Sequence, residues 1–325
     1  QSPRLRGKFR VAEVRGGLVA LTPLAPFRLA DLCSLRCFGT VGFVIDTTPA
    51  APAGSWEALA AALASPVSRR LLRAFTDGAI RYRLNFIDKG HQRGAVRLLA
   101  ARVYSLCPDL LNDARHVTWT ADIYPAGRGH SVEWRPNLTP DPRFYYRRHD
   151  VPAASHPPLA ACMARLAGRA DHEIVWDPFC GSGLELIECA LLGGVQRLHG
   201  TDRAPAAIAI ARRNFAAAKL DPLPAEFTCC DFRDFAAAAG LRPASVSLVI
   251  TNPPLGRRVP VPDLRGLIKD LFDAAATVLR PGGRLVFANP ISASSPHPSF
   301  QLRFRQPVDF GGFDCRLEMY LKRAR

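Results

Sequence analysis

Apolar runs of four to eight residues alternate with helical patterns along the second half of the chain, from about residue 172. The apolar runs include HEIVWDPF (172–179), RLHGTD (197–202) and SVSLVITN (245–252), and amphipathic segments such as PAAIAIARRNFAAAK (205–219) separate them. Buried strands that alternate with helices are typical of a parallel sheet covered on both faces. The pattern therefore predicts an α/β domain with a doubly wound, mostly parallel sheet, to which FDCRLEMYLKR (313–323) adds an edge strand.

A different pattern occupies the first half of the chain. Short β-like runs at 9–23 and 35–46 precede an Ala/Pro-rich linker, which starts at residue 49 and becomes a short amphipathic helix at Trp56. The segments that follow predict a strand at 81–90, a helix at 91–107 and a hairpin at 116–125 and 130–138. Because the strand at 81–90 alternates apolar with mostly basic residues, we expect an α+β module with one basic face.

The net charge of the chain indicates which class of partner it binds. A net charge of +15 and a pI of about 10.0 favour a polyanion such as nucleic acid over a small anionic metabolite, although biased codon use could also raise the arginine content. Nine cysteines without paired CxxC spacing indicate reduced thiols rather than a zinc site, and we expect no metal.

The sequence leaves two alternatives for the location of the protein in the cell. No apolar run of about 18 residues occurs, so we expect no membrane partner and a cytoplasmic protein. The chain begins at Gln1 rather than methionine, so a missing targeting segment would instead imply a nuclear or organellar location.

The motif DPFCGSG joins the first strand of the predicted sheet to its first helix. The carboxyl ends of strands line the ligand crevice of such folds, and glycine lets a ligand approach the backbone closely. Gly181 and Gly183 therefore predict a cofactor loop, with a plain tight turn as the alternative. A third glycine at GxGxxG spacing and the Lys-Ser/Thr pair of a P-loop are both missing.

Two acids follow the next two strands. Asp202 lies about twenty residues after the glycines, where a carboxylate can accept both hydroxyls of a ribose, and Asp231 could accept from an adenine amino group. Each alone could be a turn residue or a helix cap. At successive strand ends they predict a nucleoside pocket.

The stretch ITNPPLGRR (250–258) ends the fourth strand of the same sheet. Its two prolines fix a stiff, non-helical turn, so the side-chain carbonyl of Asn252 and a backbone carbonyl of the turn become two fixed acceptors. Two acceptors suit an exocyclic amine, whose lone pair can then be aimed in line at an electrophilic methyl group. An ordinary strand-ending loop is the alternative.

These motifs resemble the class I S-adenosylmethionine-dependent amino-group methyltransferases, whose fourth motif is (N/D/S)PP(Y/F/W). With the preceding PRFYYRRHDVPAASHPPLAACMARLAG, they are more narrowly similar to RNA guanine-N2 methyltransferases with an N-terminal THUMP domain. The resemblance is strong over roughly residues 143–290 and weaker over about 40–138. It implies a partial ferredoxin-like α+β segment at 1–48, a THUMP-like RNA-binding domain at 49–140 and a Rossmann-like methyltransferase domain at 141–325.

The resemblance also implies roles for single residues. The catalytic turn is Asn252, Pro253, Pro254 and Leu255. S-adenosyl-L-methionine is bound by Asp177, Pro158, Pro178, Phe179, Cys180, Gly181, Gly183, Asp202, Arg203, Asp231, Phe232 and Asn252. RNA is bound by Arg81, Arg83, Lys89, Arg93, Arg97, Arg147, Arg148, Arg257 and Arg258.

Leu255 departs from the family pattern, because the aromatic residue at this place stacks on the flipped target base. Base stacking on an aromatic ring contributes on the order of 1–3 kcal/mol, which leucine does not provide. Phe179, or a guanidinium of Arg257 or Arg258, could stack instead.

We expect an RNA-modifying methyltransferase that acts on N2 of guanosine in structured RNA, with tRNA preferred and ribosomal RNA as an alternative. A small activating subunit is an open partner. The other functions are an adenine-N6 methyltransferase on RNA or DNA, and a catalytically weak THUMP-type RNA-binding protein.

Overall fold

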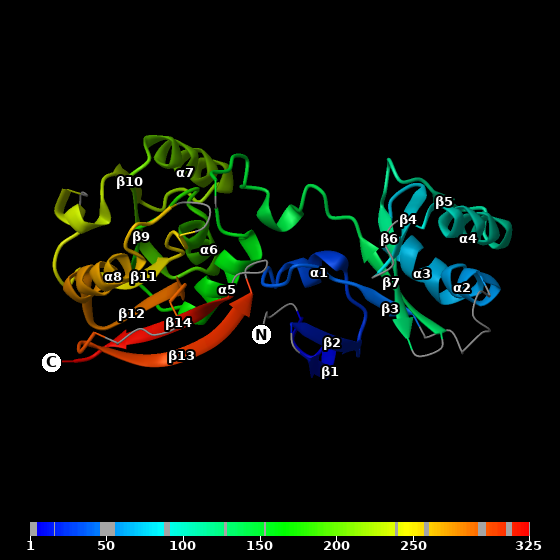
Figure 1. Ribbon diagram of the computed structural model, residues 1–325, viewed down its shortest axis with the longest axis horizontal. Coiled ribbons are helices and arrows are strands. Elements are labelled where there is room, and N and C mark those ends of the chain that lie inside the picture. Colours follow the sequence, from blue (N-terminus) through cyan, green and yellow to red (C-terminus); the bar gives the residue numbers. More distant parts are fainter. Residues whose placement is uncertain are drawn as a thin grey trace. The chain divides into compact units, whose positions relative to one another are not determined.

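The computed structural model describes residues 5–15, 17–45, 56–87, 92–126, 129–152, 154–237, 240–256, 260–291, 297–309 and 314–324. The chain divides into two compact units, Gln1–Pro142 and Arg143–Arg325, which are described one at a time (Figure 1). Within the described ranges, no helix has both the length and the apolar character needed to cross a bilayer.

A seven-stranded sheet forms the centre of the second unit, in the order β10-β9-β8-β11-β12-β14-β13. The strands are β8 (Glu173–Asp177), β9 (Val195–Asp202), β10 (Ala225–Cys229), β11 (Val246–Thr251), β12 (Leu279–Asn289), β13 (Phe300–Asp309) and β14 (Asp314–Lys322). Strands β8 to β12 pair in parallel, whereas β14 runs antiparallel to both of its neighbours. The predicted α/β class with a mostly parallel sheet is confirmed.

The predicted place of the last strand is wrong. FDCRLEMYLKR contains β14, which lies between β12 and β13 rather than at the edge. Its charged residue Glu318 is fully buried, and Arg305 of β13 and Asn289 of β12 both donate to it. The two neighbouring strands thus supply hydrogen bonds to the buried Glu318 of β14. Strand β13, which the pattern did not predict, forms the edge.

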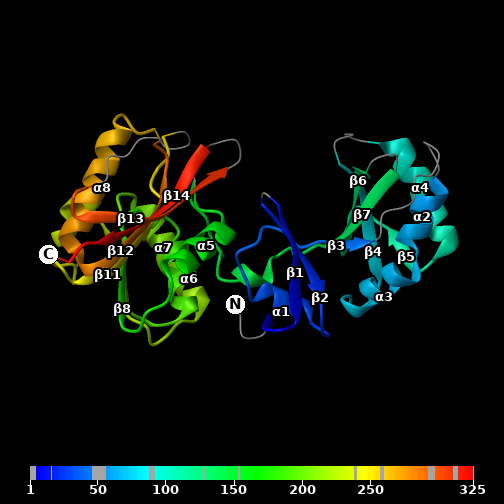
Figure 2. The same cartoon turned by 90° about the horizontal axis from the view of Figure 1, so that it is seen from below.

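Helices cover both faces of this sheet (Figure 2). Helix α8 (Leu264–Val278) packs on one face, against side chains that include Val249 and Phe287. On the other face lie α5 (Pro157–Ala167), α6 (Leu184–Leu192) and α7 (Pro205–Ala218). Every residue of β11 is buried. Because successive strand residues point to opposite faces, β11 is covered on both sides, as its continuous apolar run predicts.

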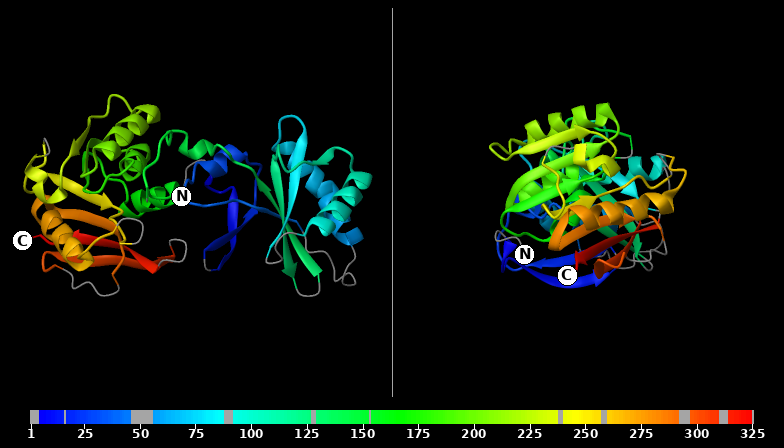
Figure 3. Two further views of the ribbon diagram at one scale, coloured as in Figure 1. Left: turned by 45° about the horizontal axis from the view of Figure 1, so that its top comes forward. Right: turned by 90° about the vertical axis from the view of Figure 1, so that its left-hand side faces the viewer.

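The first unit contains a five-stranded sheet in the order β3-β7-β6-β4-β5. Its strands are β3 (Phe43–Ile45), β4 (Ile80–Phe86), β5 (Leu110–Asn112), β6 (Trp119–Ala126) and β7 (Gly129–Pro136). Helices α2 (Trp56–Leu63), α3 (Pro66–Ala74) and α4 (Arg93–Leu106) pack on one face of it. A separate hairpin of β1 (Phe9–Arg15) and β2 (Leu18–Pro23) precedes the short helix α1 (Leu29–Cys33), and it is the dark blue ribbon of Figure 3.

The predicted helix at Trp56, the strand at 81–90, the helix at 91–107 and the hairpin of β6 and β7 are confirmed. The run at 35–46 forms only the three-residue strand β3, and α1, α3 and β5 were not predicted. The Ala/Pro linker lies outside the described residues, except for its helical end.

Candidate active site

The loop after β8 takes a conformation that only glycine adopts readily. Gly181 and Gly183 have positive φ angles of 50° and 82°. A Cβ on Gly183 would lie 3.3 Å from the Cβ of Ala211 on α7, so this glycine also permits close helix packing. The loop ends at Gly183, the residue that precedes helix α6.

Asp202, at the end of β9, braces this loop from the neighbouring strand. Its Oδ2 accepts from the backbone N–H of Gly181 at 3.0 Å, and its Oδ1 accepts from the N–H of Ala204 at 2.9 Å. Each carboxylate oxygen has a further lone pair. The geometry therefore leaves acceptors at the place where the sequence predicts a ribose.

Asp231 follows β10 and is held by arginines. Arg233 contacts its Oδ2 at 3.1 Å, and the Nε of Arg203 lies 3.7 Å from the same oxygen. The next residue, Phe232, is almost completely buried, and its ring packs on that of Phe179 with the centroids 4.7 Å apart. Phe179 is thus partly occupied by a protein contact, which limits it as a stacking partner for a base.

Asp177 lies beneath the loop, with no exposed surface. Thr251, the last residue of β11, donates to its Oδ1 at 2.6 Å, and the N–H of Phe179 donates to the same oxygen at 3.0 Å. Burial raises the pKa of Asp177 well above its usual value, and nearby Glu185 adds to the rise. Asp177 therefore ties the ends of β8 and β11 together and supports the loop from below.

Asn252 starts the turn that follows β11. Its Nδ2 donates to the hydroxyl of Ser155 at 2.9 Å, while its Oδ1 is shielded from solvent and has no hydrogen-bond partner among the described residues. A buried acceptor without a partner is costly, so it marks a place where a donor from outside the chain would be stabilised. Pro253 is buried, and Pro254 and Leu255 are half-buried.

The remaining predicted cofactor residues also belong to these strand ends and to α5. Pro178 and Cys180 belong to the loop, where burial raises the pKa of the Cys180 thiol well above its usual value and makes it unreactive. Pro158 is buried in the first turn of α5, a helix that contacts β11. Within the described part of the chain, no three His, Cys, Asp or Glu side chains are grouped to hold a metal ion.

Three residues that the sequence analysis did not single out shape this site. Asn214 is fully buried in α7 and accepts from the N–H groups of Arg148 and His149, while it donates to the carbonyl of Ser182. A polar residue on the apolar face of a helix was its signal in the sequence. Ser155 and Glu185 had no such signal, because their contacts depend on tertiary structure.

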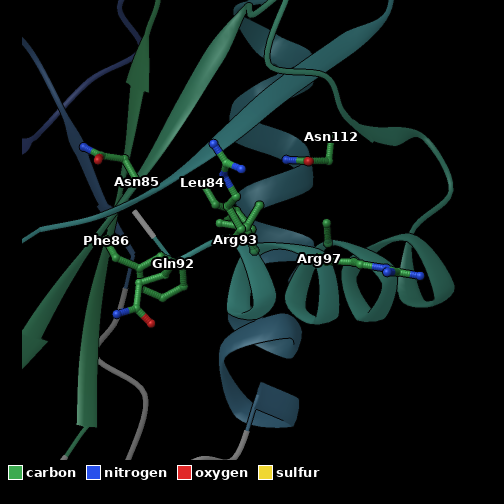
Figure 4. Close-up of a pocket in the computed structure, with 9 residues that line it drawn as sticks. Leu84, Asn85, Phe86, Gln92, Arg93, Arg97 and Asn112 are labelled. Carbon is green, nitrogen blue, oxygen red and sulfur yellow. The ribbon is translucent and has the colours of Figure 1, made fainter. Parts of the chain in front are cut away.

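The predicted RNA-binding arginines of the first unit divide into two groups. Arg81 is paired with Asp113 at 2.6 Å, which offsets its charge, whereas Arg83 donates to the neutral hydroxyl of Thr120. Arg93 and Arg97 of α4 are exposed and line a cavity of about 510 Å³ between α4 and the strands β4 and β5 (Figure 4). The other lining residues are Leu84, Asn85, Phe86, Gln92, Val96, Ala100 and Asn112.

The other predicted RNA contacts belong to the second unit or cannot be described. Arg147 is paired with Asp150, and the backbone of Arg148 is fixed by Asn214. Lys89, Arg257 and Arg258 lie outside the described residues.

Comparison with known proteins agrees with this geometry. Residues 145–295 match a protein-family model described as the RMKL-like methyltransferase domain. A tRNA (guanine(10)-N2)-dimethyltransferase of Methanothermobacter thermautotrophicus is 28% identical over 185 residues, which cover 56% of this chain and 49% of the relative. The protein of the same name from Methanocaldococcus jannaschii is 28% identical over 155 residues, covering 46% and 41%. The chain thus aligns with less than half the length of each relative.

Solved structures share the fold. TrmN from Thermus thermophilus superposes with a TM-score of 0.70 and 21% identity over 96% of this chain and 93% of its own. SMU.472, determined in complex with SAH, has a TM-score of 0.63 at 14% identity and covers 91% and 88%. Residues 145–295 are thus similar to the RMKL-like methyltransferase domain, and the solved structures share the fold in which the strand ends described above are arranged.

Proposed function

We propose that this chain transfers a methyl group from S-adenosylmethionine to N2 of guanosine in tRNA. The observation that carries the proposal is the shielded, unpartnered Oδ1 of Asn252 at the end of β11. An acceptor in this place suits the N–H of an exocyclic amine and would hold it while its lone pair points away. The relatives with 28% identity, named as tRNA guanine-N2 methyltransferases, support the choice of base and of RNA.

The residues present fit the cofactor. The glycine loop offers backbone that a ligand can approach, Asp202 retains free lone pairs, and the structural relative SMU.472 was determined with SAH bound. When bound, S-adenosylmethionine supplies an electrophilic methyl group on a sulfonium. Asp202 and the loop of Gly181 and Gly183 would hold the cofactor, and Oδ1 of Asn252 would hold the target amine beside that methyl group. Transfer would form the nitrogen–carbon bond, leave the carbon–sulfur electron pair on sulfur and release the amine proton to solvent.

The first test of the proposal is methyl transfer by the purified full chain. Labelled S-adenosylmethionine is incubated with unmodified tRNA transcripts, ribosomal RNA fragments and single-stranded DNA of equal length. We expect label in tRNA and background levels in DNA; label in DNA alone would favour the adenine-N6 alternative, and no label in any nucleic acid would contradict the proposal. A rate that rises only when cell extract is added would support a small activating subunit.

The proposed location follows from the proposed substrate. The described cysteines form no disulfide bonds, and the proposed RNA substrate is handled inside the cell. We therefore propose a reducing compartment, the cytoplasm.

RNA binding is expected to depend steeply on salt, because the net charge of +15 favours phosphate contacts. Exposed Arg93 and Arg97 should contribute to this dependence. The double variant R93A/R97A is expected to weaken tRNA binding and to reduce the slope of log K against log salt by about two. Fluorescence anisotropy over a salt series measures both quantities.

Arg102 provides the matched control, because it is exposed on the same helix but is paired with Glu57 at 2.9 Å. R102A should leave the slope almost unchanged. Equal slopes for wild type and R93A/R97A would exclude the cavity arginines from RNA binding.

Leu255→Tyr tests where the target base lies. Leu255 is half-buried directly after the rigid prolines, and a tyrosine ring there would offer the stacking surface that leucine lacks. We expect L255Y to retain or raise kcat/KM for tRNA, by up to about tenfold, consistent with stacking energies, whereas L255A should lower it. Loss of activity in L255Y with intact cofactor binding would show that the base is held elsewhere.

A further inference from the structure

The side-chain amide of Asn252 is hydrogen-bonded on one side only. Its Nδ2 donates to the Oγ of Ser155 at 2.9 Å, and the hydroxyl of Ser155 in turn donates to Oε1 of Glu185. Ser155 and Glu185 are 8% and 4% exposed, so water competes little for these contacts. Three residues from separate parts of the chain thus form one chain of hydrogen bonds, which ends at the unpartnered Oδ1 of Asn252.

The number of protons available sets the donor-to-acceptor direction of these hydrogen bonds. A serine hydroxyl has a single proton, and an ionised carboxylate can only accept. Since Ser155 gives its proton to Glu185, only its lone pairs remain for Asn252, and these require the amide N–H rather than the carbonyl. The carbonyl oxygen of Asn252 must therefore face the opposite way.

Glu185 has to be an acceptor for this logic to hold. Burial raises the pKa of both Glu185 and nearby Asp177, and it raises the pKa of Asp177 well above its usual value. The hydrogen bonds from Ser155 and from backbone at the start of α6 act against the rise at Glu185, while Glu188 adds to it. The geometry agrees with an acceptor at Glu185, since the hydroxyl of Ser155 donates to its Oε1.

We propose that Ser155 and Glu185 are positioning residues that lock the amide of Asn252 with its carbonyl oxygen toward the target base. The inference rests on the proposed function and deepens it. A reversed amide would present an N–H to the target and would suit a carbonyl oxygen, such as O6 of guanine, instead of an amine. The Ser155–Glu185 pair thus selects an exocyclic amine as the methyl acceptor.

The direction of the hydrogen bonds from Asn252 through Ser155 to Glu185 predicts an unusual order of single-turnover rates among the variants. Ser155→Ala removes the lock, so the amide can take either orientation, and we expect the single-turnover rate on tRNA to fall about tenfold, in keeping with the loss of one orienting hydrogen bond. Glu185→Met leaves the hydroxyl of Ser155 free to donate to Oδ1 of Asn252, which enforces the wrong orientation. We expect a larger fall, of about fiftyfold.

The double variant S155A/E185M should be faster than E185M alone and return to the rate of S155A. Affinities for S-adenosylmethionine and tRNA should change less than twofold in all three variants, because neither side chain is expected to contact these ligands. Ser247→Ala is the matched control: Ser247 lies on β11 and also donates to a buried glutamate, Glu173, at 2.9 Å. Its removal should leave the rate unchanged.

Several outcomes would overturn the inference. One is E185M no slower than S155A, and another is a double variant whose loss is the product of the two single losses, as two merely structural roles would give. If E185M does not fold, the rates of S155A and S247A still test the inference. Equal rates for S155A, S247A and wild type would show that Ser155 does not orient the amide of Asn252. A wild-type chain that transfers no methyl group to any RNA would instead contradict the proposed function, and the inference with it.

Discussion

Asn252→Ala is expected to lower the rate of methyl transfer to tRNA by about a hundredfold, the order of magnitude found when one preorganised polar contact at a reacting centre is lost. Oδ1 of Asn252 is the unpartnered acceptor of the turn, and rigid Pro253 and Pro254 keep it in place. Cofactor and tRNA affinities should fall far less than the rate, since the lost acceptor is proposed to hold the reacting amine. Single-turnover kinetics with saturating RNA and cofactor isolates this step.

Asn252→Ser is the paired variant, because serine occurs at this place in the motif of the resembling family and keeps an acceptor. N252S should be faster than N252A. If N252A transfers methyl groups at the wild-type rate, the target amine is not held at the turn after β11.

Asp202→Ala is expected to weaken binding of S-adenosylmethionine by about a hundredfold, or about 2.7 kcal/mol. The variant removes the acceptors proposed for the ribose and also the brace on the N–H groups of Gly181 and Ala204. Both losses act on the bound cofactor, so isothermal titration calorimetry with S-adenosylmethionine or its demethylated product measures them directly.

Asp171→Ala controls for the loss of a carboxylate. Asp171 is largely exposed in the segment before β8, and among the described residues it makes a single long contact, with Arg169 at 3.5 Å. D171A should bind the cofactor like wild type. A dissociation constant for D202A within threefold of wild type would remove Asp202 from the cofactor site.

The sequence predicts the second unit well, because the apolar and polar pattern within each short segment indicates whether that segment is a strand or a helix. The continuous apolar runs at β8 and β11 can be satisfied only by strands buried on both faces, and the parallel pairing follows from the helices between them. Once the sheet is parallel, its carboxyl ends share one edge, so the sequence predicts that Gly181, Asp202 and Asn252 lie together.

The order of the last strands could not be predicted in the same way. Glu318 gives β14 the polarity of an edge strand, but Arg305 and Asn289 donate to it from the two neighbours. Such compensation comes from residues that are distant in the chain. The same applies to Arg81, whose charge is neutralised by Asp113 at 2.6 Å across the sheet.

Contacts around the candidate site follow this rule as well. Ser155 precedes Asn252 by 97 residues and Glu185 follows Ser155 by 30, so no periodicity links them. Sequence reasoning located the acceptor of the turn. Only the folded structure shows which side of the amide is occupied.

The most direct test of the central claim is mass spectrometry of nucleosides from tRNA methylated by the purified chain. The transcript is incubated with S-adenosylmethionine carrying a deuterated methyl group, digested completely and separated by liquid chromatography. We predict labelled N2-methylguanosine, formed about a hundredfold more slowly when N252A replaces the wild-type chain. Labelled N6-methyladenosine without labelled N2-methylguanosine, or a label that persists unchanged with N252A, would contradict the account.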